Sequence, residues 1–249
     1  MKYWLILAVS LSLSARVLAQ DVVNLGATEY PPYSGEGLAR GGLINQIVTE
    51  AYERVGYEVK IHFFPWARAA RMAQDGELDG LAQVWLREAR RSWLLYSDPV
   101  PSPNEMVFYK RKDTKIEFDN QNYLSLKPYT IGTGRGYANP PEFEKAQGQL
   151  RIEFVTEDIQ NLQKLVSGRI DLVIIDKLVA QHLLRAQIPK ALDTLNWITP
   201  ALSIEQNHVG ISKKASEFEK KHRDFNRGLL LLKQAGRIKA ILAEHGFKD

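Results

Sequence analysis

Three arginines follow a short apolar segment in the first third of the chain, and their spacing could serve anion binding. The apolar run 79–84 predicts a buried strand and residues 88–95 predict a helix, so Arg87, Arg90 and Arg91 fall at the N-terminal end of that helix. Cations are disfavoured there, because the free backbone N–H groups already make that end positive. The cluster therefore suits an anion bound between arginines. The alternative is three solvated surface arginines with stems on apolar neighbours.

Aromatic side chains accompany these arginines in two turns. Tyr30 and Tyr33 enclose two consecutive prolines, and Trp66 follows a predicted strand at 59–64. Rings at such positions can cover the flat or apolar part of a small ligand. The Tyr-Pro-Pro-Tyr turn could equally be a stiff connector without a role in binding.

The elements that must position these side chains alternate between strand and helix. Strands are expected at 22–27, 59–64 and 79–84, and helices at 43–55 and 67–74. This order predicts a parallel sheet with right-handed crossovers. Ligands of parallel sheets bind beyond the carboxyl ends of the strands, which is where Tyr30, Trp66 and the segment 83–90, beginning with Gln83, are expected.

The character of the sequence changes after the Ser-Asp-Pro segment at 97–99. An extended stretch, 104–111, leads into the polar, turn-rich stretch 112–127, so we predict a crossing into a second domain near Arg111. Beyond it, strands are expected at 129–133, 151–155, 171–175 and 208–212, and helices at 158–166, 215–235 and 237–245. The strand at 208–212 is expected to return to the first domain.

Two features of this second region could also contact a ligand. The turn 132–137 contains three glycines together with Arg135 and Tyr137, but its spacing is not that of a dinucleotide-binding fingerprint. Asp158 begins a predicted helix, where an acidic residue ordinarily serves as a cap.

The order Pro-Trp, Arg, GELDG (76–80), Arg90 and Ser-Asp-Pro (97–99) resembles the extracellular solute-binding proteins of family 3. The resemblance covers nearly all of the mature chain. It implies that Trp66 stacks on a ligand, that Arg90 clamps a carboxylate and that Tyr30 covers the ligand. Most members have a Thr-Pro-Glu-like turn where this chain has Arg-Glu-Ala at 87–89, so a positive charge replaces a hydroxyl here.

The resemblance also implies a fold and roles for the second region. Members have an α/β, two-lobe, type II periplasmic-binding-protein fold, in which each lobe is a mainly parallel sheet flanked by helices and two hinge crossings join the lobes. Lobe 1 would comprise residues 20–110 and 203–249, and lobe 2 residues 111–202. The glycine-rich turn would line the cleft with backbone N–H groups, and Asp158 would hold a ligand ammonium.

Residues 1–19 read as a cleavable secretory signal, because a lysine near the start precedes an apolar run and a small residue ends it. We expect a periplasmic protein. The chain has no cysteine, which leaves neither disulfides nor a site for acyl anchoring. Its formal net charge is +4, and removal of Lys2 and Arg16 with the signal leaves 4 − 2 = +2. That balance argues against a nucleic-acid partner.

Catalytic motifs are missing from the sequence. The five histidines lack metal-ligand spacing, and there is neither a GxSxG serine nor a cysteine nucleophile. We expect a monomeric binding protein without cofactor or metal. It would capture an amino acid or small organic acid for the membrane permease of an ABC importer or for a receptor. The alternatives are a dehydratase-like enzyme acting on a small cyclic carboxylate and a ligand-sensing module of a signalling system.

Overall fold

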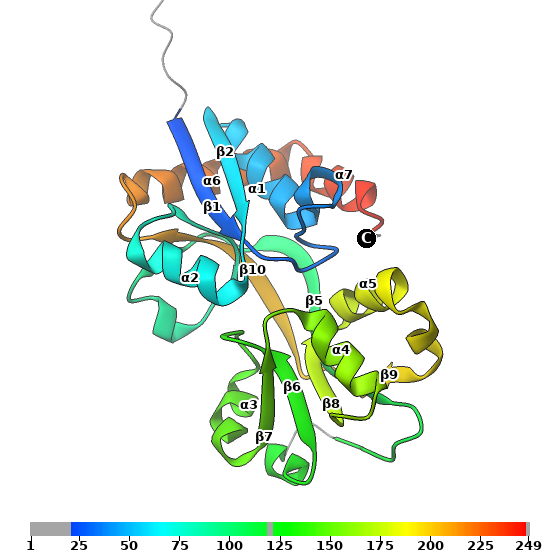
Figure 1. Ribbon diagram of the computed structural model, residues 1–249. Coiled ribbons are helices and arrows are strands. Elements are labelled where there is room, and N and C mark those ends of the chain that lie inside the picture. Colours follow the sequence, from blue (N-terminus) through cyan, green and yellow to red (C-terminus); the bar gives the residue numbers. More distant parts are fainter. Residues whose placement is uncertain (1–20, 119–121, 248–249) are drawn as a thin grey trace, which may run out of the picture.

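The computed structural model describes residues 21–118 and 122–247, so the predicted signal at 1–19 lies outside the described residues. A mixed sheet runs through the molecule in the order β2-β1-β3-β10-β5-β8-β6-β7, with β4 paired to β10 and β9 paired to β5. Figure 1 shows helices gathered around each end of this sheet, so that two lobes lie above and below the crossing of β5 and β10.

Lobe 1 contains the first parallel part of the sheet and the two C-terminal helices. Its strands are β1 (Asp21–Ala27), β2 (Tyr57–Phe63), β3 (Gly80–Trp85) and β4 (Leu94–Tyr96), and its helices are α1 (Leu43–Glu53), α2 (Trp66–Asp75), α6 (Phe218–Gln234) and α7 (Arg237–Glu244). β1 lies parallel to both β2 and β3, as the sequence order predicts. Gly228 allows α6 to lie directly on α1, because a Cβ at this position would fall 1.9 Å from the carbonyl oxygen of Ala51.

Lobe 2 repeats the pattern of a parallel sheet with helices. Its strands are β6 (Thr130–Gly134), β7 (Arg151–Val155), β8 (Leu172–Asp176) and β9 (Leu195–Trp197), and its helices are α3 (Pro141–Ala146), α4 (Asp158–Val166) and α5 (Lys177–Gln187). β6 is parallel to both β7 and β8. Short 3-10 turns occur at Ala39–Gly41, Glu88–Arg90, Tyr123–Leu126, Gln147–Gln149 and Pro189–Asp193.

Two long antiparallel strands, β5 (Val100–Arg111) and β10 (Ser203–Ser212), connect the lobes. β10 pairs with β3 and β4 of lobe 1, whereas β5 pairs with β8 and β9 of lobe 2. Between these regions the two strands pair with each other from Ser203 opposite Met106 to Asn207 opposite Val100, with a register shift between Glu205 and Asn207. The boundaries at 110/111 and 202/203 fall at the lobe 2 ends of these strands and stay a prediction.

The helix predicted at 88–95 is wrong. Only a 3-10 turn forms at Glu88–Arg90, and Leu94–Tyr96 is the strand β4. The cause is a distant part of the chain: Leu94, Leu95 and Tyr96 pair with residues 210–212 of β10, and the pairing places Leu94 and Tyr96 among the buried side chains. The three arginines therefore do not crowd a helix N-terminus, and any role for them must rest on where their side chains lie.

Candidate functional site

A pocket lies where the carboxyl ends of β1, β2 and β3 face the turn after β6. Its empty volume is about 390 Å³, including space open to solvent. The lining residues are Thr28, Tyr30, Trp66, Gln83, Val84, Trp85, Arg90, Tyr137 and Ala138. Five of the nine predicted ligand residues, Tyr30, Trp66, Gln83, Arg90 and Tyr137, are thus brought to one place. Their contacts with a ligand stay a prediction.

Three aromatic rings pack edge to face along this pocket. The ring of Tyr30 lies 6.2 Å from that of Trp85 and 6.3 Å from that of Tyr137, with interplanar angles of 79° and 77°. Tyr30 is held by a tight turn around the two prolines, because the backbone N–H of Tyr30 donates to the carbonyl oxygen of Ser34. Gly134 makes room for the Tyr137 ring, since a Cβ there would lie 2.5 Å from it.

Trp66 joins lobe 1 to lobe 2 across the mouth of the pocket. As the first residue of α2, it directs its indole N–H to the carbonyl oxygen of Gly136, at 2.8 Å. Gly136 has φ +72°, a conformation that side chains disfavour, so the glycine permits the turn that presents this carbonyl. The resemblance implied backbone N–H groups at this turn, yet the group that meets lobe 1 is a carbonyl oxygen.

Arg90 is the positive group of the pocket. Its guanidinium lies 5.0 Å from the centre of the Trp66 ring and donates long hydrogen bonds, both 3.4 Å, to the carbonyl oxygens of Trp85 and Gly136. Burial lowers the pKa of Arg90 from its usual value. Among residues 21–118 and 122–247, no carboxylate lies within 4.0 Å of its guanidinium. Arg90 is therefore a cation without a directly contacting carboxylate in these parts of the chain, and among their carboxylates only the more distant Glu144 acts on its charge.

Arg87 differs from Arg90, because its charge is matched by the protein. One guanidinium nitrogen lies 3.1 Å from the Glu205 carboxylate on β10, and the other donates to the carbonyl oxygen of Asn139 at 2.8 Å. The Glu144 carboxylate lies 3.9 Å from its Nε. Arg87 thus connects the loop after β3 with the connecting strand β10 and with lobe 2, and it is not among the residues that line the pocket.

Asp158 lies behind Tyr137, whose hydroxyl donates to the Asp158 carboxylate at 3.3 Å. Burial raises the pKa of Asp158 to about 7, and the hydrogen bond from Tyr137 opposes that rise. The alternative of a plain N-cap is wrong, because Glu157 caps α4 and forms a capping box with Gln160, leaving Asp158 as the first helical residue. Its carboxylate is therefore available for a contact other than capping.

Asp176 is a second buried acid near the pocket, and it was not among the predicted ligand residues. It follows the apolar strand β8 and caps α5 by accepting from the N–H groups of Leu178 and Val179. The side chains of Asn104 on β5 and Tyr33 of lobe 1 also donate to it, at 3.0 Å and 3.4 Å. Burial raises its pKa to about 7. Tyr33, a predicted ligand residue, is thus fully buried against an acid of lobe 2 and does not line the pocket.

Arg135 lies apart from the pocket. Its side chain belongs to an open groove on lobe 2, between the end of β7 and α4. The other lining residues of this groove are Phe154, Val155, Thr156, Gln160, Gln163, Lys164, Ser167 and Arg169. Its backbone N–H donates to Val155, which closes the turn after β6. A ligand contact of Arg135 in the pocket between the lobes stays a prediction that this placement does not favour.

The sequence profile of the bacterial extracellular solute-binding proteins, family 3, matches residues 23–248. The chain belongs to this family. Solved structures similar to this family 3 protein include the P235GK mutant of the arginine-binding protein from T. maritima, at 21% identity and a TM-score of 0.74 over 90% of this chain and 94% of that one. The two-lobe, type II periplasmic-binding-protein fold is thereby confirmed.

Two other solved structures are similar to this solute-binding protein. An ancestral arginine-binding protein bound to arginine has 19% identity and a TM-score of 0.75, over 90% of this chain and 98% of that one. A histidine kinase sensor domain with similarity to periplasmic binding proteins has 17% identity and a TM-score of 0.77, over 90% and 96%. No curated protein sequence matches this chain.

Two searches of the described residues bear on other kinds of site in this solute-binding protein. In the segments 21–118 and 122–247, no group of three His, Cys, Asp or Glu side chains is arranged to hold a metal ion. Within the same segments, no helix is long and apolar enough to cross a membrane. The family is one of extracellular binding proteins, in agreement with a role in binding.

Proposed function

We propose that this protein captures a small carboxylate-bearing ligand, in the first place an amino acid, in the pocket between its lobes. The observation that carries the proposal is the partly buried guanidinium of Arg90, which meets the ring of Trp66 and two carbonyl oxygens but no carboxylate among the described residues. A buried charge is costly unless it is paired and hydrogen-bonded. A ligand carboxylate would supply the pair through two parallel charged hydrogen bonds.

Other groups of the pocket would hold the rest of the ligand. Trp66 and Tyr30 would cover its apolar part, and Asp158 would meet an ammonium group from behind Tyr137. Two similar structures are described as an ancestral arginine-binding protein, one bound to arginine and the other bound to glutamine, and both ligands are amino acids. This likeness supports an amino acid as the class of ligand, without selecting a particular amino acid.

The route of the ligand after capture is part of the same proposal. The mature protein would work in the periplasm as a monomer and deliver its ligand to the membrane permease of an ABC importer. A structure described as the substrate binding protein of an amino acid ABC transporter supports this use of the fold, at 17% identity and a TM-score of 0.73. The sensor-domain neighbour supports a second use, in which the closed protein signals to a receptor. The dehydratase alternative stays a prediction.

A thermal-shift screen of the purified mature protein tests the proposal. Amino acids, small organic acids and polyamines would be added one at a time at concentrations up to 1 mM. A ligand present at 100 times its Kd stabilises the folded state by about 2.7 kcal/mol. For a chain of this size that stabilisation should raise Tm by roughly 5–10 °C. Shifts with polyamines and none with any carboxylate would overturn the proposal.

A further inference from the structure

The pocket walls are built for a flat group. The rings of Trp85 and Tyr137 stand at 79° and 77° to the ring of Tyr30, and all three side chains line the pocket. Val84 and Ala138, which also line the pocket, are apolar, and the polar lining residues are Thr28, Gln83 and Arg90. Rings set at right angles offer both a face and an edge, and an aromatic ring packs well against each of them.

The same rings could also hold a cation, and Arg90 decides between the two possibilities. Its guanidinium already lies over the ring of Trp66, so one of the cation-binding ring faces of the pocket is taken. A second positive group beside it would lie next to a desolvated like charge. The portion of the ligand that enters between the rings should therefore be uncharged, while its carboxylate meets Arg90.

Gln83 adds a hydrogen-bonding requirement. It shares one face of β3 with Trp85, two residues further along, and both side chains line the pocket. Its amide oxygen is buried and has no hydrogen-bond partner in the described parts of the chain. A buried acceptor without a partner is unfavourable, so a site containing one favours a ligand that brings a donor.

From these observations, and resting on the proposed function, we infer that the ligand is an aromatic carboxylate whose ring carries an N–H or O–H donor for Gln83. The ring lies among Tyr30, Trp85 and Tyr137, and the carboxylate lies on Arg90. Phenol-bearing and indole-bearing acids have this chemistry. They occur with an α-ammonium group, as amino acids, and without one, as simple aromatic acids.

Calorimetric titration of the wild-type protein tests the ligand class. The probes are L-tyrosine, L-tryptophan and L-phenylalanine, with 4-hydroxyphenylpropionate as the ammonium-free counterpart of tyrosine and L-leucine and L-arginine as non-aromatic amino acids. Tyrosine should bind about 10-fold to 100-fold more tightly than phenylalanine, because only tyrosine supplies a donor. Comparison of tyrosine with 4-hydroxyphenylpropionate separates the two sources of the same ring and carboxylate.

The variant Gln83→Met tests the role of the amide, since methionine keeps a similar length without polar groups. The ratio of phenylalanine Kd to tyrosine Kd should fall to near one in Gln83→Met, mainly through weaker tyrosine binding. Gln163→Met, on the exposed face of α4 outside the pocket, is the matched control and should keep the wild-type ratio. Thermal melts of both variants establish that they fold.

The outcomes separate this inference from the function on which it rests. Tighter binding of leucine or arginine than of any aromatic acid would overturn the inference and leave carboxylate capture standing. An unchanged tyrosine preference in a folded Gln83→Met protein would also overturn it, and the wild-type comparison stands by itself if that variant does not fold. Binding of no carboxylate at all would overturn the proposed function.

Discussion

Where the lobes meet, lobe 1 presents the cations and N–H donors of Arg90 in the pocket and of Arg87 beside it, whereas lobe 2 presents the carbonyl oxygens of Gly136 and Asn139, with Asp158 buried behind a tyrosine. The two walls are thus opposite in charge, but they do not neutralise each other completely. Arg87 reaches Glu205 and lobe 2, while Arg90 meets no carboxylate of the described residues. We therefore expect Arg87 to maintain the arrangement of the lobes, and the proposed function assigns Arg90 to the ligand.

The largest expected effect is that of removing the unpaired cation. Arg90→Ala should weaken binding of a carboxylate ligand by about 2–5 kcal/mol, because a buried, hydrogen-bonded charge pair would lose one partner. Calorimetric titration with the best ligand of the thermal-shift screen measures the loss. Unchanged affinity would show that Arg90 does not bind the ligand carboxylate and so does not differ from Arg87 in this respect.

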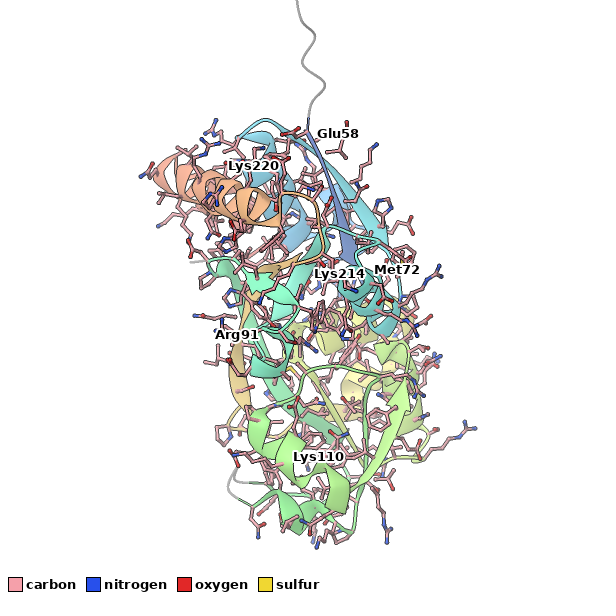
Figure 2. All side chains as sticks on the ribbon, turned by 90° about the vertical axis from the view of Figure 1, so that its left-hand side faces the viewer. Glu58, Met72, Arg91, Lys110, Lys214 and Lys220 are labelled. Atoms are coloured by element: carbon pink, nitrogen blue, oxygen red, sulfur yellow. The ribbon has the colours of Figure 1, made fainter. Side chains whose placement is uncertain are left out.

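Arg91→Ala is the matched control for Arg90→Ala. Figure 2 shows Arg91 at the outside of the molecule, near the level at which the lobes meet. Its guanidinium pairs with Glu88 at 2.7 Å and lies half exposed, so its loss should change ligand affinity little.

A smaller effect is expected from Asp158, on the lobe 2 side, through the pH dependence of the free energy of unfolding. Asp158 has a folded-state pKa of about 7, above its ordinary value of 3.8. Between these values the folded state keeps a proton that the unfolded state has lost, so the free energy of unfolding should fall as the pH rises from about 4 to about 7. The fall could reach about 4 kcal/mol, since each pKa unit corresponds to about 1.4 kcal/mol.

Asp158→Asn should remove the part of this slope that belongs to Asp158, and urea denaturation at pH 5 and pH 8 measures it. Asp176 has a pKa raised in the same direction and is expected to keep its own part of the slope in the variant. Asp193→Asn, at an exposed position, is the control and should leave the slope unchanged. A slope that Asp158→Asn leaves intact would show that Asp158 itself is ionised in the folded protein over this pH range.

The smallest effect is expected for Arg87. Arg87→Gln removes the ion pair with Glu205 and weakens the link to Asn139, so it should shift ligand-free protein towards open forms and reduce affinity by about 1 kcal/mol. Small-angle scattering with and without ligand measures the opening, and calorimetry measures the affinity. A loss as large as that of Arg90→Ala would assign Arg87 to the ligand, as the sequence analysis predicted.

Much of the fold could be predicted because local signals agree with the packing. The strand at 151–155 and the helix at 158–166 have the predicted bounds, and Gly76 ends α2 in a left-handed conformation. The wrong helix at 88–95 depends on pairing with residues 210–212, which no local pattern contains. The helices α3 and α5 were not predicted.

The candidate site was predicted in part, for a similar reason. Trp66 and Gln83 stand at or near the carboxyl ends of parallel strands, and topology brings such ends together. The structure also shows Trp85, Thr28 and Ala138 lining the pocket, and none of them was among the predicted ligand residues. Trp85 does lie within the segment 83–90, which was expected at the carboxyl ends of the strands. Asp176 was missed because it follows an apolar strand directly, and only the structure shows its carboxylate contacting both lobes.

The pairing of β5 with β10 also limits how the two lobes can move. Strands bonded side by side form a ribbon, which bends across its flat face far more readily than it shears in its own plane. A hydrogen bond from the side-chain amide of Asn207 to that of Asn104 also joins the two strands of this ribbon. We therefore expect the lobes to rotate about a single axis. Each opening would then widen the same side of the pocket, and each closure would restore the same contacts between the lobes.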